Sequence, residues 1–298
     1  MVPSGSAGLF GLVVNGAAGK GRGARAALLA ADRLRAAGFG VREITGDTAA
    51  ESLLAARSAV AQGLSGLVAV GGDGTVNLAL QAVAGTQTPL GIVPAGTGND
   101  FAGALGLSAK RPEAAIAAIA TGAIRTVDAV RVGDRWWDCV MGAGFDSAVN
   151  ERANGMRWPR GPMRYNLAIL AELGVFRPKA FTLTLDGERH DVDALLIAVA
   201  NAPAYGGGLR VAPDARLADG LLDVVVVAPM SKPTFLRLLP KVRTGNHLGH
   251  PAVTVYRAGV VELAGEGQTA YADGERLAAL PVRAECVPGA LRVFAAAT

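Results

Sequence analysis

Through roughly its first 130 residues, the sequence alternates short apolar runs with segments of helical periodicity. Runs typical of buried strands occur at residues 9–15, 41–44, 66–70 and 90–96. Helical periodicity occurs at residues 23–38, 49–60, 77–84 and 113–122. Strands that alternate with helices favour crossover connections and a parallel sheet covered by helices on both faces. We therefore expect a parallel α/β domain that binds ligands at the carboxyl ends of its strands.

The pattern changes after about Thr126, where β-rich runs joined by glycine-containing turns replace the alternation. These runs lie at residues 127–145, 181–201, 221–229, 251–265 and 280–289. Two segments, 160–176 and 231–245, have helical patterns instead. This half predicts an antiparallel sandwich or barrel. We expect an α/β domain over residues 1–128 and a β-rich domain over 129–287, with 288–298 packing back on the first.

Composition limits the partners that the chain can have. With 298 residues, 51% of them hydrophobic and 18% charged, it can bury a large core. No apolar run approaches the ~20 residues that span a bilayer, and MVPSGSAGLFGLVV lacks a signal-peptide pattern, so we expect a cytoplasmic protein. Two cysteines suit a reducing compartment. A net charge of +4 favours anionic ligands or an anionic membrane surface, and no basic run interleaved with aromatics indicates nucleic acid.

Glycine-rich turns follow three of the predicted strands. GGDGT (71–75) stands at a strand-to-helix junction, where backbone N–H groups and the helix dipole favour a phosphate. Asp73 would repel that phosphate unless Mg²⁺ or a proton-transfer role compensates its charge, so the turn indicates a nucleotide with its metal. A glycine turn capped by an aspartate, with no ligand, is the structural alternative.

The other two turns are PAGTGNDFA (94–102) and NGAAGKGRG (15–23). The first repeats threonine and aspartate among glycines, so it can form a second wall of the same cleft. The second is not a Walker A loop, because Lys20 is followed by Gly21 in place of serine or threonine, and it lacks the GxGxxG spacing. A P-loop and a Rossmann dinucleotide site are therefore disfavoured.

GGDGTVN and PAGTGNDFA together resemble the diacylglycerol kinase catalytic-domain family, which includes bacterial soluble lipid kinases and sphingosine kinases. The resemblance continues, in the order of that family, at GAGFDSAV (142–149), at 201–227, at TGNHLGHP (244–251) and at YADGE (271–275). It covers nearly the whole chain. It implies an N-terminal nucleotide-binding domain like those of phosphofructokinases and NAD kinases, a C-terminal antiparallel β-sandwich, and ATP bound between the two.

The resemblance also implies a set of site residues. The nucleotide would contact Asn15, Thr45, Gly72, Asp73, Gly74, Thr75, Val76, Asn77, Leu78 and Thr97. The catalytic Mg²⁺ and its water network would be held by Asp73, Asp100 and Asp128. Glu275 would be the catalytic base, with Asp273 and Gly274 shaping its turn. Carboxylates that hold Mg²⁺, together with one base, are a sufficient set for phosphoryl transfer to an alcohol.

A second, structural Mg²⁺ is implied in the β-rich domain. Asp219 would supply a carboxylate, and Arg216 and Leu221 would supply backbone carbonyls, an oxygen set that hard cations accept. A β-turn at residues 219–220 without any ion is the equal alternative.

Two positions depart from the family's pattern: Gly16 replaces a common proline, and Leu78 replaces a common acidic residue. We expect an ATP- and Mg²⁺-dependent lipid kinase that makes phosphatidic acid from diacylglycerol. Another lipid acceptor (phosphatidylglycerol, sphingosine or ceramide), an NAD kinase-like or sugar-phosphate kinase, and a catalytically weak nucleotide- or lipid-binding regulator stay open. The lipid substrate implies reversible contact with a membrane surface; a homodimer is also open.

The stretch at residues 151–170 bears on contact with a membrane. It carries Arg152, Arg157, Arg160 and Arg164 beside Met156, Trp158 and Met163. This pattern favours either an amphipathic approach to anionic lipid headgroups or a partly exposed helical hairpin that covers the sandwich.

Overall fold

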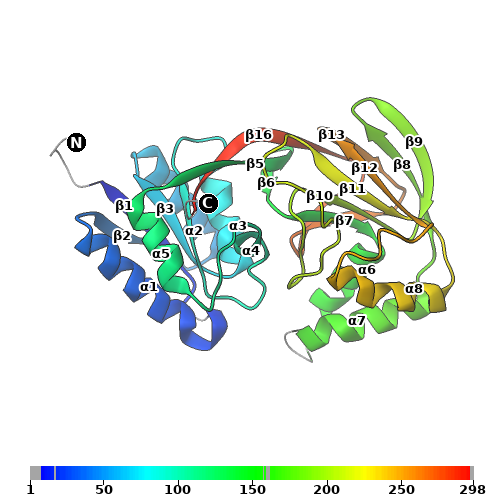
Figure 1. Cartoon of the computed structure of the whole chain (residues 1–298), viewed down its shortest axis with the longest axis horizontal. Coiled ribbons are helices and arrows are strands. Elements are labelled where there is room, and N and C mark those ends of the chain that lie inside the picture. The colour runs from blue at the N-terminus through cyan, green and yellow to red at the C-terminus, as the bar shows by residue number, and fades with distance from the viewer. Residues whose placement is uncertain (1–7, 17, 157, 159–161, 296–298) are drawn as a thin grey trace. The chain divides into compact units, whose positions relative to one another are not determined.

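The computed structural model describes residues 8–16, 18–156, 158 and 162–295, which fall into two compact units. Unit 1 runs to Ala129 and resumes at Pro288, and unit 2 spans Val130–Val287. The chain passes between the units twice, once in strand β5 (Ile124–Val132) and once in strand β16 (Val282–Phe294) (Figure 1). The C-terminal end of the chain therefore contributes a strand to unit 1.

Unit 1 is a parallel sheet with strand order β2-β1-β3-β4, and the end of β16 lies beside β4. Its strands are β1 (Leu9–Val14), β2 (Gly40–Ile44), β3 (Gly66–Gly71) and β4 (Leu90–Pro94). Its helices are α1 (Ala18–Ala36), α2 (Ala49–Ala61), α3 (Asp73–Val83), α4 (Asp100–Ala104) and α5 (Pro112–Thr121). Helices α1 and α5 contact each other, as do α2 and α3 (Figure 1). The α/β prediction is confirmed.

The core of unit 1 explains why its strands read as continuous apolar runs. Strand β3 is buried along its whole length, because helices cover both faces of the sheet. On one face Phe10 and Val68 pack against Leu34 of α1 and Ile119 of α5. This core fixes the sheet and leaves the carboxyl ends of its strands to carry the glycine-rich turns.

Unit 2 contains two antiparallel sheets. The first has the order β12-β11-β10-β7-β14-β15 and is formed by β7 (Val140–Gly144), β10 (Leu196–Ala200), β11 (Leu222–Val227), β12 (Val253–Ala258), β14 (Thr269–Ala272) and β15 (Glu275–Ala279). The second has the order β16-β13-β8-β9, from the first part of β16 with β13 (Val260–Ala264), β8 (Lys179–Leu185) and β9 (Glu188–Ala194). The end of β5 pairs with β6 (Arg135–Trp137).

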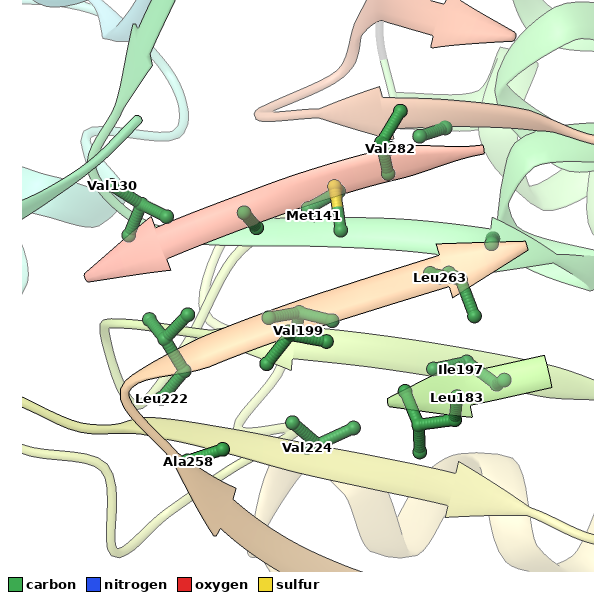
Figure 2. Packing of buried hydrophobic residues seen from close by; sticks show 14 of the residues in the cluster. Val130, Met141, Leu183, Ile197, Val199, Leu222, Val224, Ala258, Leu263 and Val282 are labelled. Atoms are coloured by element: carbon green, nitrogen blue, oxygen red, sulfur yellow. The ribbon is translucent and has the colours of Figure 1, made fainter. Parts of the chain in front are cut away.

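The two sheets of unit 2 enclose one apolar core. Met141, Ile197 and Val224 from the first sheet pack in the same cluster as Leu183 and Leu263 from the second (Figure 2). Two antiparallel sheets that bury facing side chains form a β-sandwich. The predicted sandwich is confirmed.

Unit 2 also carries helices α6 (Phe145–Gly155), α7 (Pro162–Val175) and α8 (Lys232–Leu238), followed by a 3₁₀ helix (Leu239–Arg243). The β-rich run predicted over residues 127–145 ends one residue early, because Gly144, at φ 83°, turns the chain into α6. The segment 231–245 is not one helix. Its α-helical part ends at Leu238, just before Pro240, which has no N–H to continue it.

Unit 1 also differs in detail from the sequence prediction. Helix α3 begins at Asp73 and not at Asn77, because Gly72 is already in extended backbone as the N-cap. The short helix α4, inside the third glycine-rich turn, was not predicted. No helix of the described chain is long and apolar enough to cross a membrane.

Candidate functional site

Three glycine-rich turns meet at one edge of the unit 1 sheet. Parallel pairing places Val14 of β1 opposite Val70 of β3, and Val70 opposite Val93 of β4. The turns that follow these strands therefore emerge side by side. The N–H of Asn15 donates to the carbonyl of Val70 over 3.0 Å, which joins the first turn to the second.

The second and third turns touch through their backbones. A Cβ added at Gly96 would lie 2.5 Å from the Cα of Gly72, and one added at Gly72 would lie 3.1 Å from the Cα of Gly96. Neither neighbour is a flexible side chain, so only glycine permits this approach. The N–H of Ala95 also donates to the carbonyl of Gly71 over 2.7 Å. The glycines of these turns therefore serve chain-to-chain packing as well as ligand access.

Asp73 ties the second and third turns together by its side chain. Its Oδ2 accepts the N–H of Asn99 over 2.8 Å, and its Oδ1 accepts the N–H of Asp100 over 2.7 Å. These donors are the first N–H groups of α4, and Asp73 itself lies in the first turn of α3. Backbone N–H groups that donate to a carboxylate form charge-assisted hydrogen bonds, which are stronger than neutral ones. Its negative charge is thus tolerated before any cation binds.

Asn99 shapes the third turn from within. It adopts left-handed backbone (φ 61°), and its side chain accepts from the N–H of Gly96 and donates to the carbonyl of Gly96, each over 3.0 Å. The same carbonyl accepts Nη2 of Arg22 over 3.3 Å. Arg22 belongs to α1, so it joins the first turn to the third. Sequence reasoning missed both side chains, although Asn is the residue after glycine that most readily enters the left-handed region.

Only some of the residues predicted to bind the nucleotide have exposed side chains at this edge. Asn15, Thr45, Gly74 and Thr97 are exposed at the strand ends. Thr75 and Val76 are buried in the first turns of α3, where Thr75 Oγ1 lies against Gly71. A ligand at this edge would therefore meet their backbone more readily than their side chains. Asn77 and Leu78 are half-buried on α3.

Two of the three carboxylates predicted for Mg²⁺ converge. A Cβ added at Gly98 would lie 2.3 Å from Oδ2 of Asp73 and 3.6 Å from Oδ2 of Asp100. Asp128 is buried on β5, and its Oδ1 accepts the N–H of Gly289 over 2.9 Å, which fixes the returning chain end within unit 1. The pair Asp73 and Asp100 offers the oxygen donors that Mg²⁺ prefers, and Asp128 has a structural bond of its own.

Glu275 is presented by a tight hairpin in unit 2. Ala272 pairs with Glu275, so Asp273 and Gly274 form a two-residue turn in which both have positive φ, 50° and 84°. Aspartate followed by glycine is the preferred sequence for such a turn. The Glu275 carboxylate is 59% exposed, and its Oε2 lies 3.9 Å from Nη2 of Arg135. It is therefore accessible from solvent at a fixed position on the hairpin.

The side chain of Asp273 points back into unit 2. Its carboxylate accepts the N–H of Val140 over 3.0 Å and that of Asp138 over 3.4 Å. The side chain of Asp138 interacts with this carboxyl as well. Burial raises the pKa of Asp273 to about 6, against the opposing effect of the backbone N–H groups. Cys139 completes a group in which one ligand atom of each residue lies within 4.8 Å of the others.

The predicted structural Mg²⁺ site contains a protein cation. Arg257 donates through Nη2 to Oδ2 of Asp219 and lies 3.4 Å from Asp223 through Nε. Oδ1 of Asp219 accepts the N–H of Leu221 over 3.2 Å, as in an Asx turn. The ion pair compensates the Asp219 charge without a metal, so the geometry favours the turn alternative. The metal role of Arg216, Asp219 and Leu221 stays a prediction.

One buried polar cluster in unit 2 was not predicted as a site. The hydroxyl of Tyr205 donates to Oδ1 of Asp146 over 2.7 Å, and Asn150 donates to Oδ2 over 3.2 Å. Burial raises the pKa of Asp146, which these two hydrogen bonds partly oppose. The cluster joins the start of α6 to the glycine-rich segment around residues 205–209. An aspartate just after a Gly-Phe pair was the available signal.

Comparison with known proteins identifies the family of this chain. Residues 10–132 match the diacylglycerol kinase catalytic domain model, and residues 139–295 match the YegS C-terminal NAD kinase beta sandwich-like domain model. A diacylglycerol kinase of Mycobacterium tuberculosis is 42% identical over 288 residues, covering 95% of this chain and 93% of that protein. The chain belongs to the diacylglycerol kinase catalytic-domain family.

One further relative and one solved structure are also similar over most of the chain. A Stenotrophomonas maltophilia protein named "Probable lipid kinase YegS-like" is 30% identical over 248 residues, covering 79% of this chain and 80% of that protein. A crystal structure of a diacylglycerol kinase from Bacillus anthracis has a TM-score of 0.72 at 20% identity, covering 97% of this chain and 96% of that one, which supports the fold. The expected lipid-kinase family is confirmed.

The contact between Gly72 and Gly96 predicts that substitution of Gly96 destabilises the fold. Gly96→Ala should lower the free energy of unfolding by about 2 kcal/mol, because its methyl group would strike backbone that cannot rotate away. Gly74→Ala is the matched control, since a Cβ there has no neighbour within 4 Å. Urea unfolding followed by circular dichroism measures both. Equal stabilities for the two variants would refute the packing role of Gly96.

The acid pair behind the Glu275 hairpin predicts a pH effect. Asp273 binds its proton more tightly in the folded state, with a pKa of about 6, than in an unfolded chain, where about 3.9 is usual. It should therefore lower stability progressively as the pH rises from about 4 to 6. Asp273→Asn cannot ionise, so its stability relative to wild type should improve by about 2 kcal/mol between pH 4 and pH 7.

Urea unfolding at both pH values tests this expectation. Asp193→Asn, which changes an exposed carboxyl on β9, should keep the same stability difference from wild type at both pH values. A pH-independent difference for Asp273→Asn would mean that the buried Asp273 carboxyl does not couple stability to pH.

Proposed function

We propose that this chain is an ATP- and Mg²⁺-dependent kinase that transfers the γ-phosphoryl group to a hydroxyl of diacylglycerol, giving phosphatidic acid. The observation that carries the proposal is the joining of the GGDGT and PAGTGND turns by Asp73 at the carboxyl edge of the sheet. That edge offers helix N-termini and close backbone, which suit phosphates. The lipid acceptor is inferred from the named activity of the Mycobacterium tuberculosis relative.

Each part of the proposal has a residue assigned to it. Nucleotide phosphates would lie against the backbone of Gly72–Thr75 and against Thr97, and Asp73 with Asp100 would hold Mg²⁺. The bound metal would offset the charge of the phosphates. Glu275 would accept the proton of the lipid hydroxyl, because its carboxylate is exposed on a tight hairpin, with Arg135 at 3.9 Å. The protein would act at a membrane surface, where its substrate resides.

Glu275→Gln tests the role of the base. The change keeps the size of the side chain but removes its ability to accept a proton, so turnover should fall at least ~100-fold while nucleotide affinity is retained. Glu266→Gln, an exposed change elsewhere in unit 2, should leave turnover unaltered. Steady-state kinetics and calorimetric titration with a non-hydrolysable ATP analogue give the two quantities. Full turnover by Glu275→Gln would exclude it as the base.

The acceptor is tested by direct competition among lipids. Radiolabelled ATP with mixed micelles of diacylglycerol, phosphatidylglycerol, sphingosine or ceramide should yield labelled phosphatidic acid from the first as the main product. Strongest labelling of another lipid would replace diacylglycerol as the substrate. Nucleotide binding without labelling of any of them would favour a regulator, for which Leu78 provides the sequence reason.

A further inference from the structure

Helix α7 presents an apolar face to solvent. Its exposed positions Met163, Leu167, Leu170 and Ala171 follow the spacing of one helical face, and Val175 continues that face at the C-terminus. The side chains of Met163, Leu170 and Val175 are 59%, 60% and 65% exposed. We call Met163, Leu167, Leu170 and Val175 the α7 stripe. It lies where an ordinary surface helix would place its polar residues.

The opposite face of α7 is covered by the rest of unit 2. Ala168 is fully buried there, and Glu172 is buried and paired with Arg152 of α6. The covered side of α7 thus carries Ala168, the ion pair and the half-buried Ile169 and Leu173, while the aliphatic side chains of the α7 stripe face away. Contiguous exposed apolar surface of this kind marks an interaction site in a folded protein.

Helix α8 extends the same surface. The ring of Phe145 contacts Phe176, just after α7, and Phe235 of α8, with centroids 5.4 Å and 5.0 Å apart. Lys232 of α8 donates to the carbonyl of Gly174 near the end of α7. On the outside of α8, Leu236 is 43% exposed. The two helices therefore form one connected surface of unit 2 (Figure 1).

The sequence segments that contain α7 and α8 are strongly basic. Residues 156–180 contain five Lys or Arg and one acid, Glu172, which is buried; residues 228–250 contain four Lys or Arg and no acid. This excess is larger than the net charge of +4 of the whole chain, so the remaining sequence is net acidic. Among the described cations, Arg177 and Arg237 are exposed beside the apolar side chains.

We propose that the α7 stripe and the exposed face of α8 form the surface by which this chain docks on an anionic membrane. Apolar side chains would enter the boundary between headgroups and acyl chains, and the flanking cations would contact lipid phosphates. A second copy of the chain fits less well, because a symmetric contact would bring the same basic segments face to face. The assignment rests on the proposed action on a membrane lipid, to which it adds the docking surface.

Vesicle sedimentation with matched variants tests the surface. Wild type should bind vesicles containing phosphatidylglycerol more tightly than pure phosphatidylcholine vesicles, and added salt should weaken the binding. Leu170→Glu should bind the anionic vesicles at least about tenfold more weakly, because it replaces an apolar contact with a repelled charge. Leu54→Glu, at a 65% exposed leucine of α2, should bind as wild type does. Unchanged binding by Leu170→Glu would overturn the proposal.

A second pair of variants tests the contribution of the cations to vesicle binding. Arg237→Glu should weaken binding about tenfold and reduce its salt dependence, whereas Arg33→Glu, an exposed change on α1, should not. Equal effects of the two changes would refute a localised docking surface. Sedimentation velocity without lipid identifies the other occupant: a wild-type dimer that Leu170→Glu dissociates would assign the stripe to a second copy and overturn membrane docking.

Activity on a dispersed substrate separates this inference from the kinase proposal. Leu170→Glu should phosphorylate a short-chain, water-dispersed diacylglycerol as fast as wild type and lose activity only on long-chain substrate in vesicles. Loss on both substrates would place Leu170 in the catalytic machinery and contradict a docking role. Wild type that binds vesicles through the stripe but phosphorylates no lipid would leave the docking surface standing and refute the kinase proposal.

Discussion

The arrangement of the candidate nucleotide site depends on one carboxylate, that of Asp73. A glycine-rich strand-to-helix turn attracts phosphate, and an aspartate there is an electrostatic problem unless something compensates its charge. In this chain two backbone N–H groups, from Asn99 and Asp100, do so before any ligand arrives. The same two bonds hold the third turn against the second, where Gly72 and Gly96 meet at backbone distance. Charge compensation and loop positioning are therefore one interaction.

This double role also marks the limit of what the sequence could predict. Apolar runs that alternate with helical segments predicted the parallel sheet, and β-rich runs joined by turns predicted the sandwich. Both predictions work because burial on one or both faces of a strand sets the spacing of its apolar residues. Helix α4 and the bonds of Asn99 left none, since a five-residue helix has no period and its donors are backbone groups. The sequence indicated Asp73 as a metal ligand; that it also caps a helix 26 residues away follows only from strands β3 and β4 lying side by side.

Unit 2 shows a similar separation between pattern and context. The pattern of residues 160–176 predicted a helix, and the structure has α7 over Pro162–Val175. The sequence could not say which face of that helix is covered, because aliphatic residues stand on both the exposed and the covered side of α7. Packing against α6 uses Ala168 and the buried Glu172, so the aliphatic side chains that look like core in the sequence stay outside.

The Glu275 hairpin joins local sequence to buried chemistry. Its Asp-Gly turn is readable from the sequence, because few other residue pairs accept positive φ at both positions. What the sequence hides is that the turn's aspartate also anchors the hairpin through the N–H groups of Asp138 and Val140. Since Asp273 points inward and Glu275 lies two residues on, the buried acid fixes the position of the one that is exposed to solvent. A rigid support of this kind is what a catalytic base needs, because proton transfer tolerates little error in position.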